Sequence, residues 1–133
     1  MSDRSDPPEL AVVREIYAAF ASKDLEAILR LTDPEIVVTQ DEALPWGGRH
    51  AGHDGLGEFF LALAGTIDSS VTIEALYQAG DVVVQYGRTA GTVRATGVAF
   101  DIAECHLWKV RDGRAVEANY FIDSAAMLAA LTA

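Results

Sequence analysis

The sequence predicts an α+β fold in which a cone-shaped, strongly curved antiparallel sheet wraps around a long N-terminal helix and carries further short helices. Apolar residues near the start of the chain recur at helical spacing. From Ser70 onward the pattern changes to period two with turn residues between the runs, which is typical of strands joined as hairpins. Gly87 and Gly91 fall inside one of these strands, where bulges or strong twist would curve the sheet. Helices segregated from an antiparallel sheet indicate the α+β class.

The composition is that of one globular domain. The chain has 133 residues, of which 50% are hydrophobic, so we expect a single domain over residues 6–133 after a disordered N-terminus over residues 1–5. No apolar run is long enough to span a membrane, and the polar start lacks the apolar core of a signal peptide. These features predict a cytoplasmic protein that does not bind membranes.

Charge and cysteine content exclude two further classes. The formal net charge is −10 and no stripe of Lys and Arg compensates for it, which argues against nucleic acid as a partner. Cys105 is the single cysteine of the chain, so an internal disulfide and a Cys-rich zinc site are excluded.

Two helices and a strand are expected before residue 41. Asp6 would cap the first helix, with Pro7 in its first turn, and its inward residues would be Leu10, Val13, Ile16, Tyr17 and Phe20. The segment "SKDLEAILRL" reads as a short helix, ended by Asp33-Pro34, with Leu25, Ile28 and Leu29 inward. In the strand "EIVVTQ", one face carries Ile36, Val38 and Gln40.

The rest of the chain predicts five more strands and two more helices. A short strand over residues 43–50 leads to a helix that Asp54 would cap and Gly65 would end, with Leu56, Phe59, Phe60 and Leu63 inward. Four long strands follow as a meander, with turns at Ala79-Gly80-Asp81, Thr96-Gly97 and Asp112-Gly113. A last helix, capped by Asp123 or Ser124, would bury Met127, Leu128 and Leu131.

The turn "RDGR" decides which side chains of the last two strands face inward. A two-residue turn would pair Arg111 with Arg114 and mix apolar with acidic residues on one face. A three-residue loop with a bulge would pair Val110 with Arg114 and keep one face apolar, so we expect that register. It sets Trp108 opposite Val116, His106 opposite Ala118 and Glu104 opposite Tyr120. Glu104, His106 and Tyr120 then become inward polar groups in an apolar surrounding.

The segment "LPWGGRHAGHDGLGEFF" carries two of the three histidines and many glycines but matches no known ligand motif. His50 and His53 lack the Glu of an H-E-x-x-H zinc motif, and the glycines fit neither phosphate-binding pattern. We therefore predict a turn before a helix, with both histidines as incidental surface residues and no metal.

Three long segments, "VVREIYAAFASKDLEAILRLTDPEIVV", "LPWGGRHAGHDGLGEFF" and "LWKVRDGRAVEANYFIDSAAMLAAL", resemble SnoaL-like proteins. These belong to the nuclear-transport-factor-2-like superfamily, with the ketosteroid isomerases and polyketide cyclases. The resemblance implies a nuclear-transport-factor-2-like (cystatin-like) roll with a deep pocket. Relatives deprotonate a carbon next to a carbonyl and stabilise the enolate, or close a ring by aldol chemistry, which requires a base of tuned pKa and hydrogen-bond donors but no cofactor.

The family's catalytic residues do not carry over intact. By alignment, the general-base Asp of the isomerases falls at Gln40, their oxyanion Tyr at Ile16 and their protonated oxyanion Asp at His106. Tyr17 is one position from the oxyanion site and would point elsewhere on the helix. In the cyclases a His on the penultimate strand works with an acid on the last strand; His106 matches that His, and Tyr120 stands in place of the acid. The Asp-Arg-Asp arrangement of the related epoxide hydrolases is not apparent.

These observations lead to two functional hypotheses. The first is a cofactor-free isomerase, cyclase or hydro-lyase of a hydrophobic carbonyl compound, with His106, Glu104 and Tyr120 catalytic and with a ligand site formed by Gln40, Trp46, Tyr17, Phe60, Trp108 and Tyr86. The second is a non-catalytic ligand-binding or dimeric interaction protein on the same scaffold. Under both we expect a homodimer through the outer sheet face, which carries Leu107 and Phe121.

For each polar residue a structural interpretation stays open beside the functional one. His106 is either a base or oxyanion donor, or a buried histidine that only satisfies hydrogen bonds. Glu104 is either the base, its pKa raised by apolar surroundings, or is turned to solvent by a bulge. Gln40 either orients a ligand carbonyl or reaches solvent, and Tyr120 either donates to a ligand or is a core aromatic. Trp46 either lines the pocket mouth or anchors its loop.

Overall fold

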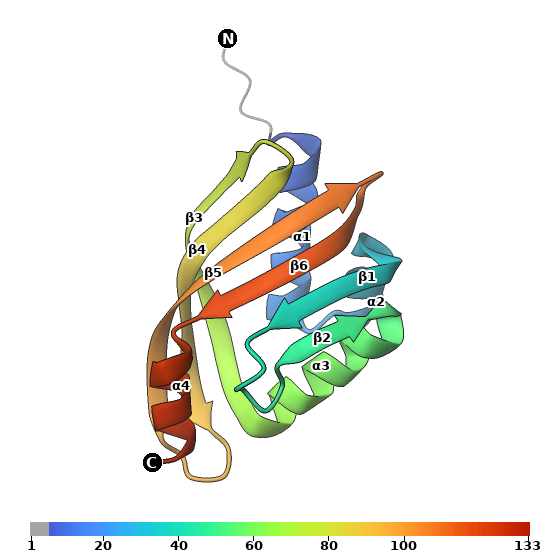
Figure 1. Cartoon of the computed structure of the whole chain (residues 1–133). Helices are drawn as coiled ribbons and strands as arrows, with labels where there is room; N and C mark the ends of the chain where they lie inside the picture. Colours follow the sequence, from blue (N-terminus) through green and yellow to red (C-terminus); the bar gives the residue numbers. More distant parts are fainter. Residues whose placement is uncertain (1–5) are drawn as a thin grey trace.

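The computed structural model describes residues 6–133, so the prediction of a disordered segment over residues 1–5 lies outside the described residues. Its elements follow the predicted order of helix, helix, strand, strand, helix, four strands and helix (Figure 1). The helices are α1 (Pro8–Ser22), α2 (Leu25–Leu31), α3 (Gly52–Thr66) and α4 (Ser124–Leu131). The strands are β1 (Thr32–Gln40), β2 (Gly48–Ala51), β3 (Ile67–Ala79), β4 (Val82–Val93), β5 (Ala99–Arg111) and β6 (Arg114–Ile122).

The strands form one curved six-stranded sheet in the order β2-β1-β6-β5-β4-β3. Figure 1 shows the sheet bent around α1 and α3, which cover its concave face, as the α+β prediction requires. All neighbouring strands are antiparallel except β1 and β6, which run parallel. The sequence-based prediction of a wholly antiparallel sheet is wrong for this one pair, because β1 and β6 are distant in the chain and no turn signal orients them.

Helix α1 begins differently from the prediction. The residue before it is Pro7, and no side chain caps its N-terminus. The carboxylate of Asp6 instead accepts a hydrogen bond from Nε of Arg14 at 2.7 Å, an ion pair along the helix surface. The apolar stripe is as expected: α1 buries Leu10, Val13, Ile16, Tyr17 and Ala19.

Helix α2 is capped by Asp24, whose carboxylate accepts from the backbone N–H of Ala27. The prediction that Leu25 faces inward is wrong, because this first residue of the helix is 59% exposed and the buried face is formed by Ala27, Ile28 and Leu31. The helix also ends before Asp33-Pro34. The hydroxyl of Thr32 donates to the carbonyl of Ile28 at 2.8 Å at the end of the last turn, and β1 begins there.

Helix α3 starts two residues before its predicted cap. Gly52 adopts a positive φ of 73° as the chain leaves β2, and Ala51 holds the cap position, so Asp54 lies within the first turn. Its charge is still favourable there because the N-terminal end of a helix dipole is positive. The helix passes Gly65 and ends at Thr66, so the predicted stop at Gly65 is also wrong.

His50 and His53 are half-buried and hydrogen-bonded, which corrects the prediction of incidental surface residues. Nε2 of His50 lies 3.1 Å from the carbonyl of Trp46, and Nε2 of His53 lies 3.0 Å from the carbonyl of Thr32. The two rings hold the loop between β1 and β2 and the start of α3 in place. Their role in the described structure is structural.

The predicted irregularity at Gly87 and Gly91 is present, but the extra residue lies on the partner strand. The register between β3 and β4 shifts between Ile73 and Ala75, so β3 carries the bulge. A Cβ on Gly87 would overlap the carbonyl oxygen of Thr72, and one on Gly91 would overlap that of Asp68. Glycine is needed at both positions because β3 approaches β4 this closely.

The register of the last hairpin corrects the three-residue loop that the sequence favoured. The turn has two residues, with φ of 54° at Asp112 and 79° at Gly113, and pairs Arg111 with Arg114. A bulge then shifts the register of β5 against β6 between Lys109 and Val110. The bulge is what restores an apolar inner face, because it sets Trp108 opposite Ala118, His106 opposite Tyr120 and Glu104 opposite Ile122.

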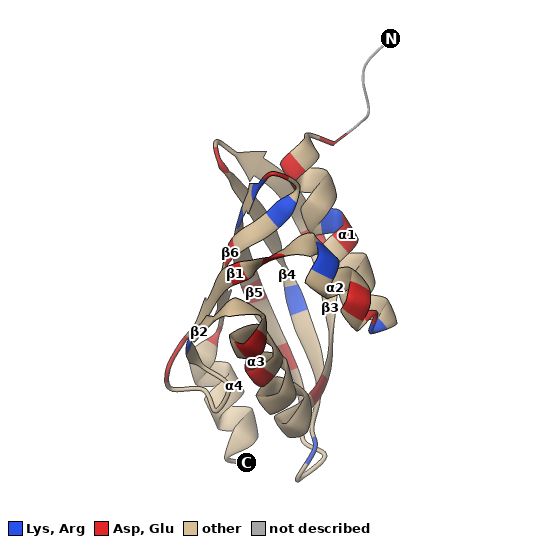
Figure 2. Cartoon of the chain, turned by 90° about the vertical axis from the view of Figure 1, so that its right-hand side faces the viewer, with Lys and Arg blue, Asp and Glu red and all other residues tan. Residues whose placement is uncertain are grey.

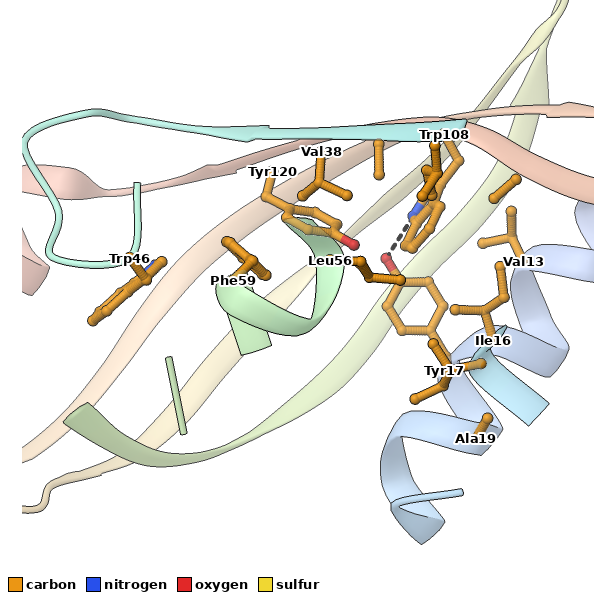
Figure 3. Close-up of a cluster of buried hydrophobic side chains, with 14 of the residues drawn as sticks. Val13, Ile16, Tyr17, Ala19, Val38, Trp46, Leu56, Phe59, Trp108 and Tyr120 are labelled. Carbon is orange, nitrogen blue, oxygen red and sulfur yellow. Dashed lines mark hydrogen bonds between the residues drawn. The ribbon is translucent and has the colours of Figure 1, made fainter. Parts of the chain in front are cut away.

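The core fills the space between the concave face and the helices, as Figure 3 shows for the side chains of α1, α3 and the sheet. Charged residues are distributed over the outside, with Lys and Arg among Asp and Glu on the helices and strands (Figure 2). Within residues 6–133, no helix combines the length and apolar character needed to cross a membrane.

Candidate active site

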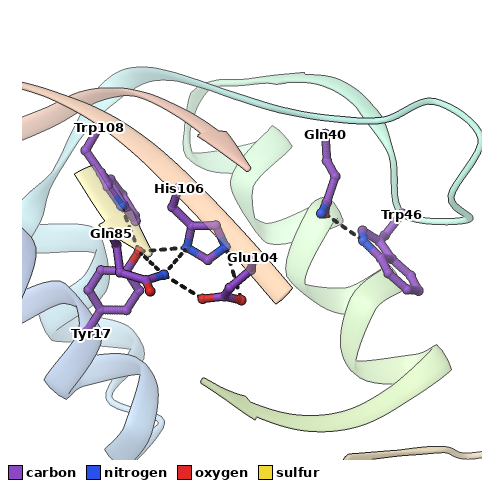
Figure 4. Close-up of polar contacts among 7 residues, drawn as sticks. All are labelled: Tyr17, Gln40, Trp46, Gln85, Glu104, His106 and Trp108. Atoms are coloured by element: carbon purple, nitrogen blue, oxygen red, sulfur yellow. Dashed lines mark hydrogen bonds and ion pairs between the residues drawn. The ribbon is translucent and has the colours of Figure 1, made fainter. Parts of the chain in front are cut away.

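Six polar or aromatic side chains meet on the concave face, beneath α1 and α3. They are Tyr17 of α1, Gln85 of β4, Glu104, His106 and Trp108 of β5, and Tyr120 of β6. We call these six residues the interior cluster; Figure 4 shows five of them and Figure 3 shows Tyr120 beside Tyr17 and Trp108. All are buried, with Glu104 only 3% exposed and His106 8%.

Strand register explains why the cluster forms. Gln85, His106 and Tyr120 are cross-strand partners and lie in one row across β4, β5 and β6. Glu104 and Trp108 flank His106 on the same face because side chains alternate along a strand. The predicted inward placement of Glu104, His106 and Tyr120 is confirmed, and a bulge does not turn Glu104 to solvent.

Tyr17 is the contribution of α1, and its placement corrects the expectation that it points elsewhere. Its hydroxyl lies 2.7 Å from Nδ1 of His106 and accepts a hydrogen bond from Nε1 of Trp108 at 2.9 Å. Ile16 is also buried, so the inward face of α1 is wide enough to hold both residues.

The donors and acceptors around Tyr17 fix the tautomer of His106. The indole N–H of Trp108 and the side-chain amide of Gln85 can only donate, so the Tyr17 oxygen accepts from both and its own proton goes to Nδ1 of His106. Nδ1 is therefore unprotonated, and the single proton of the neutral ring lies on Nε2. Nε2 faces Oε1 of Glu104 at 3.4 Å.

Glu104 is held by two neighbours within the sheet. The side-chain amide of Gln85 donates to Oε2 of Glu104, and Nε2 of His106 lies 3.4 Å from Oε1. The result is a chain of polar contacts that runs from Trp108 through Tyr17 and His106 to the carboxyl group (Figure 4).

Burial shifts the pKa values of both ionisable partners toward their neutral forms. Desolvation raises the pKa of Glu104 to about 7, against the smaller opposing effect of the hydrogen bond from Gln85. Desolvation also lowers the pKa of His106 to about 3. At neutral pH His106 is therefore uncharged, and Glu104 exchanges between carboxylate and carboxylic acid. This is the property that acid–base catalysis requires of a proton acceptor.

Aromatic rings surround the cluster. The ring of Tyr120 contacts those of His106, Trp108 and Phe59 at centroid distances of 4.6, 5.5 and 5.4 Å. Phe60, a predicted ligand residue, is half-buried and packs edge-on against Phe20 at 5.2 Å. The interior next to His106 and Tyr120 is thus rich in flat surfaces that suit a ring-containing ligand.

Three predicted ligand residues lie elsewhere or serve the fold. Nε1 of Trp46 donates to Oε1 of Gln40 at 2.7 Å, and Figure 4 shows this pair apart from the interior cluster. Gln40 and the buried Trp46 hold the loop after β1, which supports the anchoring interpretation. Tyr86 lies on the outer face and is 46% exposed, so the structure does not bring it to the site.

In the part of the chain that is described, the structure does not show an open pocket at the interior cluster, where the resemblance implies a deep one. Two shallow depressions lie on the outside: one of about 230 Å³ between α1 and α2, and one of about 380 Å³ beside β1 and β2. Neither is lined by a residue of the interior cluster. Within residues 6–133, no three His, Cys, Asp or Glu side chains are grouped so as to hold a metal ion.

Gln85 is the site residue that the sequence analysis missed. It is fully buried and contacts Glu104, Tyr17 and His106. A signal for it exists, because Val83, Gln85 and Thr89 share a face in the period-two pattern, and a lone amide next to a buried valine marks a polar inward position.

Comparisons with known proteins agree with this architecture. Residues 13–118 match the family model of the SnoaL-like domain. An NTF2-like protein of unknown function from Burkholderia pseudomallei is 26% identical over 96% of this chain and 99% of its own, with a TM-score of 0.88. IdmH, a candidate polyketide cyclase from Streptomyces antibioticus, is 29% identical over 92% of this chain and 97% of its own, with a TM-score of 0.72.

A more distant structure supports the fold alone. A protein from Catenulispora acidiphila with a ketosteroid isomerase-like fold is 18% identical over 96% of this chain and 95% of its own, with a TM-score of 0.78. The search of curated proteins gives no match. The predicted fold is confirmed by these structures, whereas the roles of individual residues rest on the geometry above.

Proposed function

The chain belongs to the SnoaL-like domain family, and from this premise we propose that it is a cofactor-free enzyme that isomerises, cyclises or dehydrates a hydrophobic carbonyl compound, with Glu104 as its general base. The observation that carries the proposal is the Glu104 carboxyl group, which is buried beside His106 and hydrogen-bonded to Gln85. A carboxylate in such surroundings is a stronger base than one in water, because proton uptake removes a poorly solvated charge.

The contacts of His106 support Glu104 rather than His106 as the base. Nδ1 of His106 accepts a hydrogen bond from Tyr17, so its lone pair is engaged. Its pKa, lowered by burial to about 3, makes the ring a weak proton acceptor. His106 instead lies beside the carboxyl group, with Nε2 at 3.4 Å from Oε1 of Glu104, and we assign it a positioning role. The same reasoning leaves Tyr17 no proton to offer a substrate.

The proposed step is proton abstraction next to a carbonyl. The Glu104 carboxylate takes the proton, the electrons of the C–H bond form the carbon–carbon double bond, and the carbonyl oxygen becomes an enolate oxygen. The acid can then return the proton at another carbon or to a leaving hydroxyl. The similarity to IdmH, a candidate polyketide cyclase, supports a carbonyl-containing substrate.

Exchange of carbon-bound hydrogen tests this step without knowledge of the natural substrate. 2-Tetralone is a flat hydrophobic ketone with exchangeable hydrogens, and proton NMR follows their replacement by deuterium in D2O. We expect the full chain to accelerate exchange, with a rate that rises with pH and levels off above about 7 as Glu104 ionises. Glu104→Gln should lower the enzymatic rate by a factor of about 10² to 10⁴.

The matched control is Glu58→Gln, which makes the same chemical change on the exposed face of α3 and should leave exchange unaltered. Exchange by Glu104→Gln at the wild-type rate would remove Glu104 from its role. Failure of the wild-type chain to accelerate exchange of 2-tetralone and of other fused-ring ketones would contradict the enzymatic proposal.

A non-catalytic ligand-binding protein is the second candidate, and one observation favours it. Gln40 stands where the isomerases carry their base, and its carbonyl is engaged by Trp46. Under this alternative, Glu104→Gln would change ligand affinity while wild-type and variant chains exchange 2-tetralone at the same background rate.

A further inference from the structure

Tyr120 is the buried member of the interior cluster whose hydroxyl has no hydrogen bond. Its side chain extends from β6 into the interior, and its ring is fixed by His106, Trp108 and Phe59. Among residues 6–133, no donor or acceptor pairs with the hydroxyl, although the residue is buried. Buried hydroxyls are rarely left unpaired, because the cost of removing them from water is then not recovered.

The other donors of the cluster are already engaged. The indole N–H of Trp108 is donated to Tyr17, and the proton of Tyr17 is donated to His106. The amide of Gln85 donates to Glu104, and the N–H of His106 faces the same carboxyl group. A substrate oxygen that arrives near Glu104 would therefore find one free O–H donor in the cluster, that of Tyr120.

The position of this hydroxyl suits an enolate oxygen. Figure 3 shows it directed into the interior, toward Leu56 and the Tyr17 hydroxyl. His106 lies opposite Tyr120 and Glu104 is the next inward residue along β5, so base and donor are diagonal neighbours on adjacent strands. The negative charge of ionised Glu104 contributes, after burial and Tyr17, to raising the pKa of Tyr120, as expected for groups that lie close together.

From this geometry we propose that Tyr120 donates the hydrogen bond that stabilises the enolate oxygen formed when Glu104 deprotonates the substrate. The proposal rests on the function proposed above. It names the hydrogen-bond donor that acts on the carbonyl oxygen while Glu104 acts as the base. Tyr120 keeps its proton throughout: the electron pair from the C–H bond moves through the new double bond to the oxygen, and the O–H of Tyr120 points to that charge. The donor to the enolate oxygen then lies on the last strand, β6, whereas the hydroxyl of Tyr17 in α1 is hydrogen-bonded to His106.

Binding of 2-naphthol separates this inference from the base assignment. 2-Naphthol has the flat skeleton of the 2-tetralone enolate and carries its oxygen at the same position, so titration calorimetry with this probe measures recognition of the oxygen without turnover. We expect Tyr120→Phe to weaken 2-naphthol binding about tenfold or more, the effect of losing a hydrogen bond to a strongly polar oxygen. It should also slow 2-tetralone exchange. Glu104→Gln should slow exchange and retain 2-naphthol binding.

Tyr86→Phe is the matched control, because it removes a tyrosine hydroxyl from the exposed outer face. It should change neither measurement. Folding is checked by thermal unfolding: Tyr120→Phe removes an unpaired buried hydroxyl, so its melting temperature should equal or exceed that of the wild type. A clear fall would show that the hydroxyl has a structural partner and would overturn the inference.

The remaining outcomes distinguish the two proposals. If Tyr120→Phe and the wild type bind 2-naphthol equally, or neither binds it, the assignment of Tyr120 is wrong whatever Glu104 does. If binding depends on Tyr120 but the wild type does not accelerate exchange, Tyr120 is confirmed as a ligand donor and the enzymatic function fails.

Discussion

Three hydrogen bonds of the interior cluster meet at the single hydroxyl of Tyr17. It accepts from Trp108 at 2.9 Å and from Gln85 at 3.3 Å, and it donates to His106 at 2.7 Å. Tyr17→Phe leaves the ring packing intact but leaves the indole N–H of Trp108 without its partner, while Nδ1 of His106 keeps only its contact with the amide of Gln85. We expect a loss of about 2–3 kcal/mol in the free energy of unfolding, measured with urea, because one buried donor is left unpaired and the hydrogen bond to His106 is lost.

The comparison with Tyr120→Phe makes this prediction specific. Both variants remove one buried tyrosine hydroxyl, yet among the residues that the structure describes only the Tyr17 hydroxyl has hydrogen-bond partners. Equal urea midpoints for the two variants would contradict the described hydrogen-bond network. In Tyr17→Phe the amide of Gln85 is the donor that remains beside Nδ1 of His106, and nitrogen-15 NMR of the ring would detect the loss of the Tyr17 hydrogen bond as a shift of the Nδ1 signal.

Glu104 and His106 give stability opposite dependences on pH. The pKa of Glu104 rises from 4.5 to about 7 on folding, so its folded state is favoured below pH 4.5 and loses that advantage as pH rises to about 7. The pKa of His106 falls from 6.5 to about 3, so its contribution is complete above pH 6.5 and is lost as pH falls to about 3. Between about pH 4.5 and 6.5 the two effects oppose each other.

Glu104→Gln should separate the pH dependence of stability that is due to Glu104 from the one that is due to His106. The variant should be more stable than the wild type at pH 8, by at most about 3 kcal/mol, because the buried charge is gone. This gain should disappear by pH 4.5, and the remaining His106 should make stability fall as pH drops from 6.5. Urea unfolding of both proteins between pH 4 and 8 measures the difference. A stability difference that does not vary with pH would contradict the raised pKa of Glu104.

Part of this site was predictable from period two alone. Alternation along β5 places Glu104, His106 and Trp108 on one face whatever the register, and Trp108 fixes that face as the inner one. Tyr17 was harder, because residues 16 and 17 both lie near the middle of an apolar stripe and spacing does not fix the rotation of a helix over a sheet. Its exact aim depends on how α1 packs, which only the tertiary structure determines.

At the scale of elements, two glycines differ in their role: one lets two strands approach closely, and the other only makes its helix more flexible. In β4, Gly87→Ala would drive its methyl group into the carbonyl of Thr72, and β3 would have to move. In α3, the exposed Gly57 has no atom near the position of a Cβ. We expect Gly87→Ala to cost roughly 2–4 kcal/mol and Gly57→Ala to add roughly 0.5–1 kcal/mol to stability. Urea unfolding measures both, and equal effects of the two substitutions would contradict the close β3–β4 contact.

The last hairpin shows what a pattern of faces can and cannot decide. The requirement of a coherent apolar face correctly placed even-numbered residues of β5 opposite even-numbered residues of β6, as His106 opposite Tyr120 shows. It did not decide between two shifts of the same parity, so His106 was expected opposite Ala118. The decisive element is the two-residue turn with positive φ at Asp112 and Gly113, followed by a bulge that moves the register the other way.

At the scale of the whole molecule, the order of elements and the curvature of the sheet followed from local signals. The parallel pairing of β1 with β6 did not, because it joins segments separated by most of the chain and depends on how the finished sheet closes over α1 and α3. The close packing of the interior likewise could not be predicted from the sequence. Phe59 packs against Tyr120, and Phe60 against Phe20, only after α3 has docked on the sheet.

The outer face of the sheet carries exposed aromatic side chains that the fold leaves uncovered. Tyr86 and Phe121 lie in one row with Cys105 between them, and Phe121 is 54% exposed. The adjacent row carries Tyr77, also exposed, and Leu107. Exposed apolar side chains gathered in neighbouring rows of a sheet are typical of an interaction site.

We propose that this face joins two copies of the chain in an isologous dimer, in which each Phe121 packs on the sheet of the other copy. Analytical ultracentrifugation at micromolar concentration should show a dimer. Phe121→Glu should shift it to a monomer because a charge would be buried at the contact. Leu61→Glu, on the exposed side of α3 and 77% exposed, is the matched control and should leave the dimer intact. A wild-type chain that sediments as a monomer, or a dimer unaffected by Phe121→Glu, would rule out this interface. Since Glu104 and Tyr120 face the opposite side of the sheet, the monomeric variant should still exchange 2-tetralone.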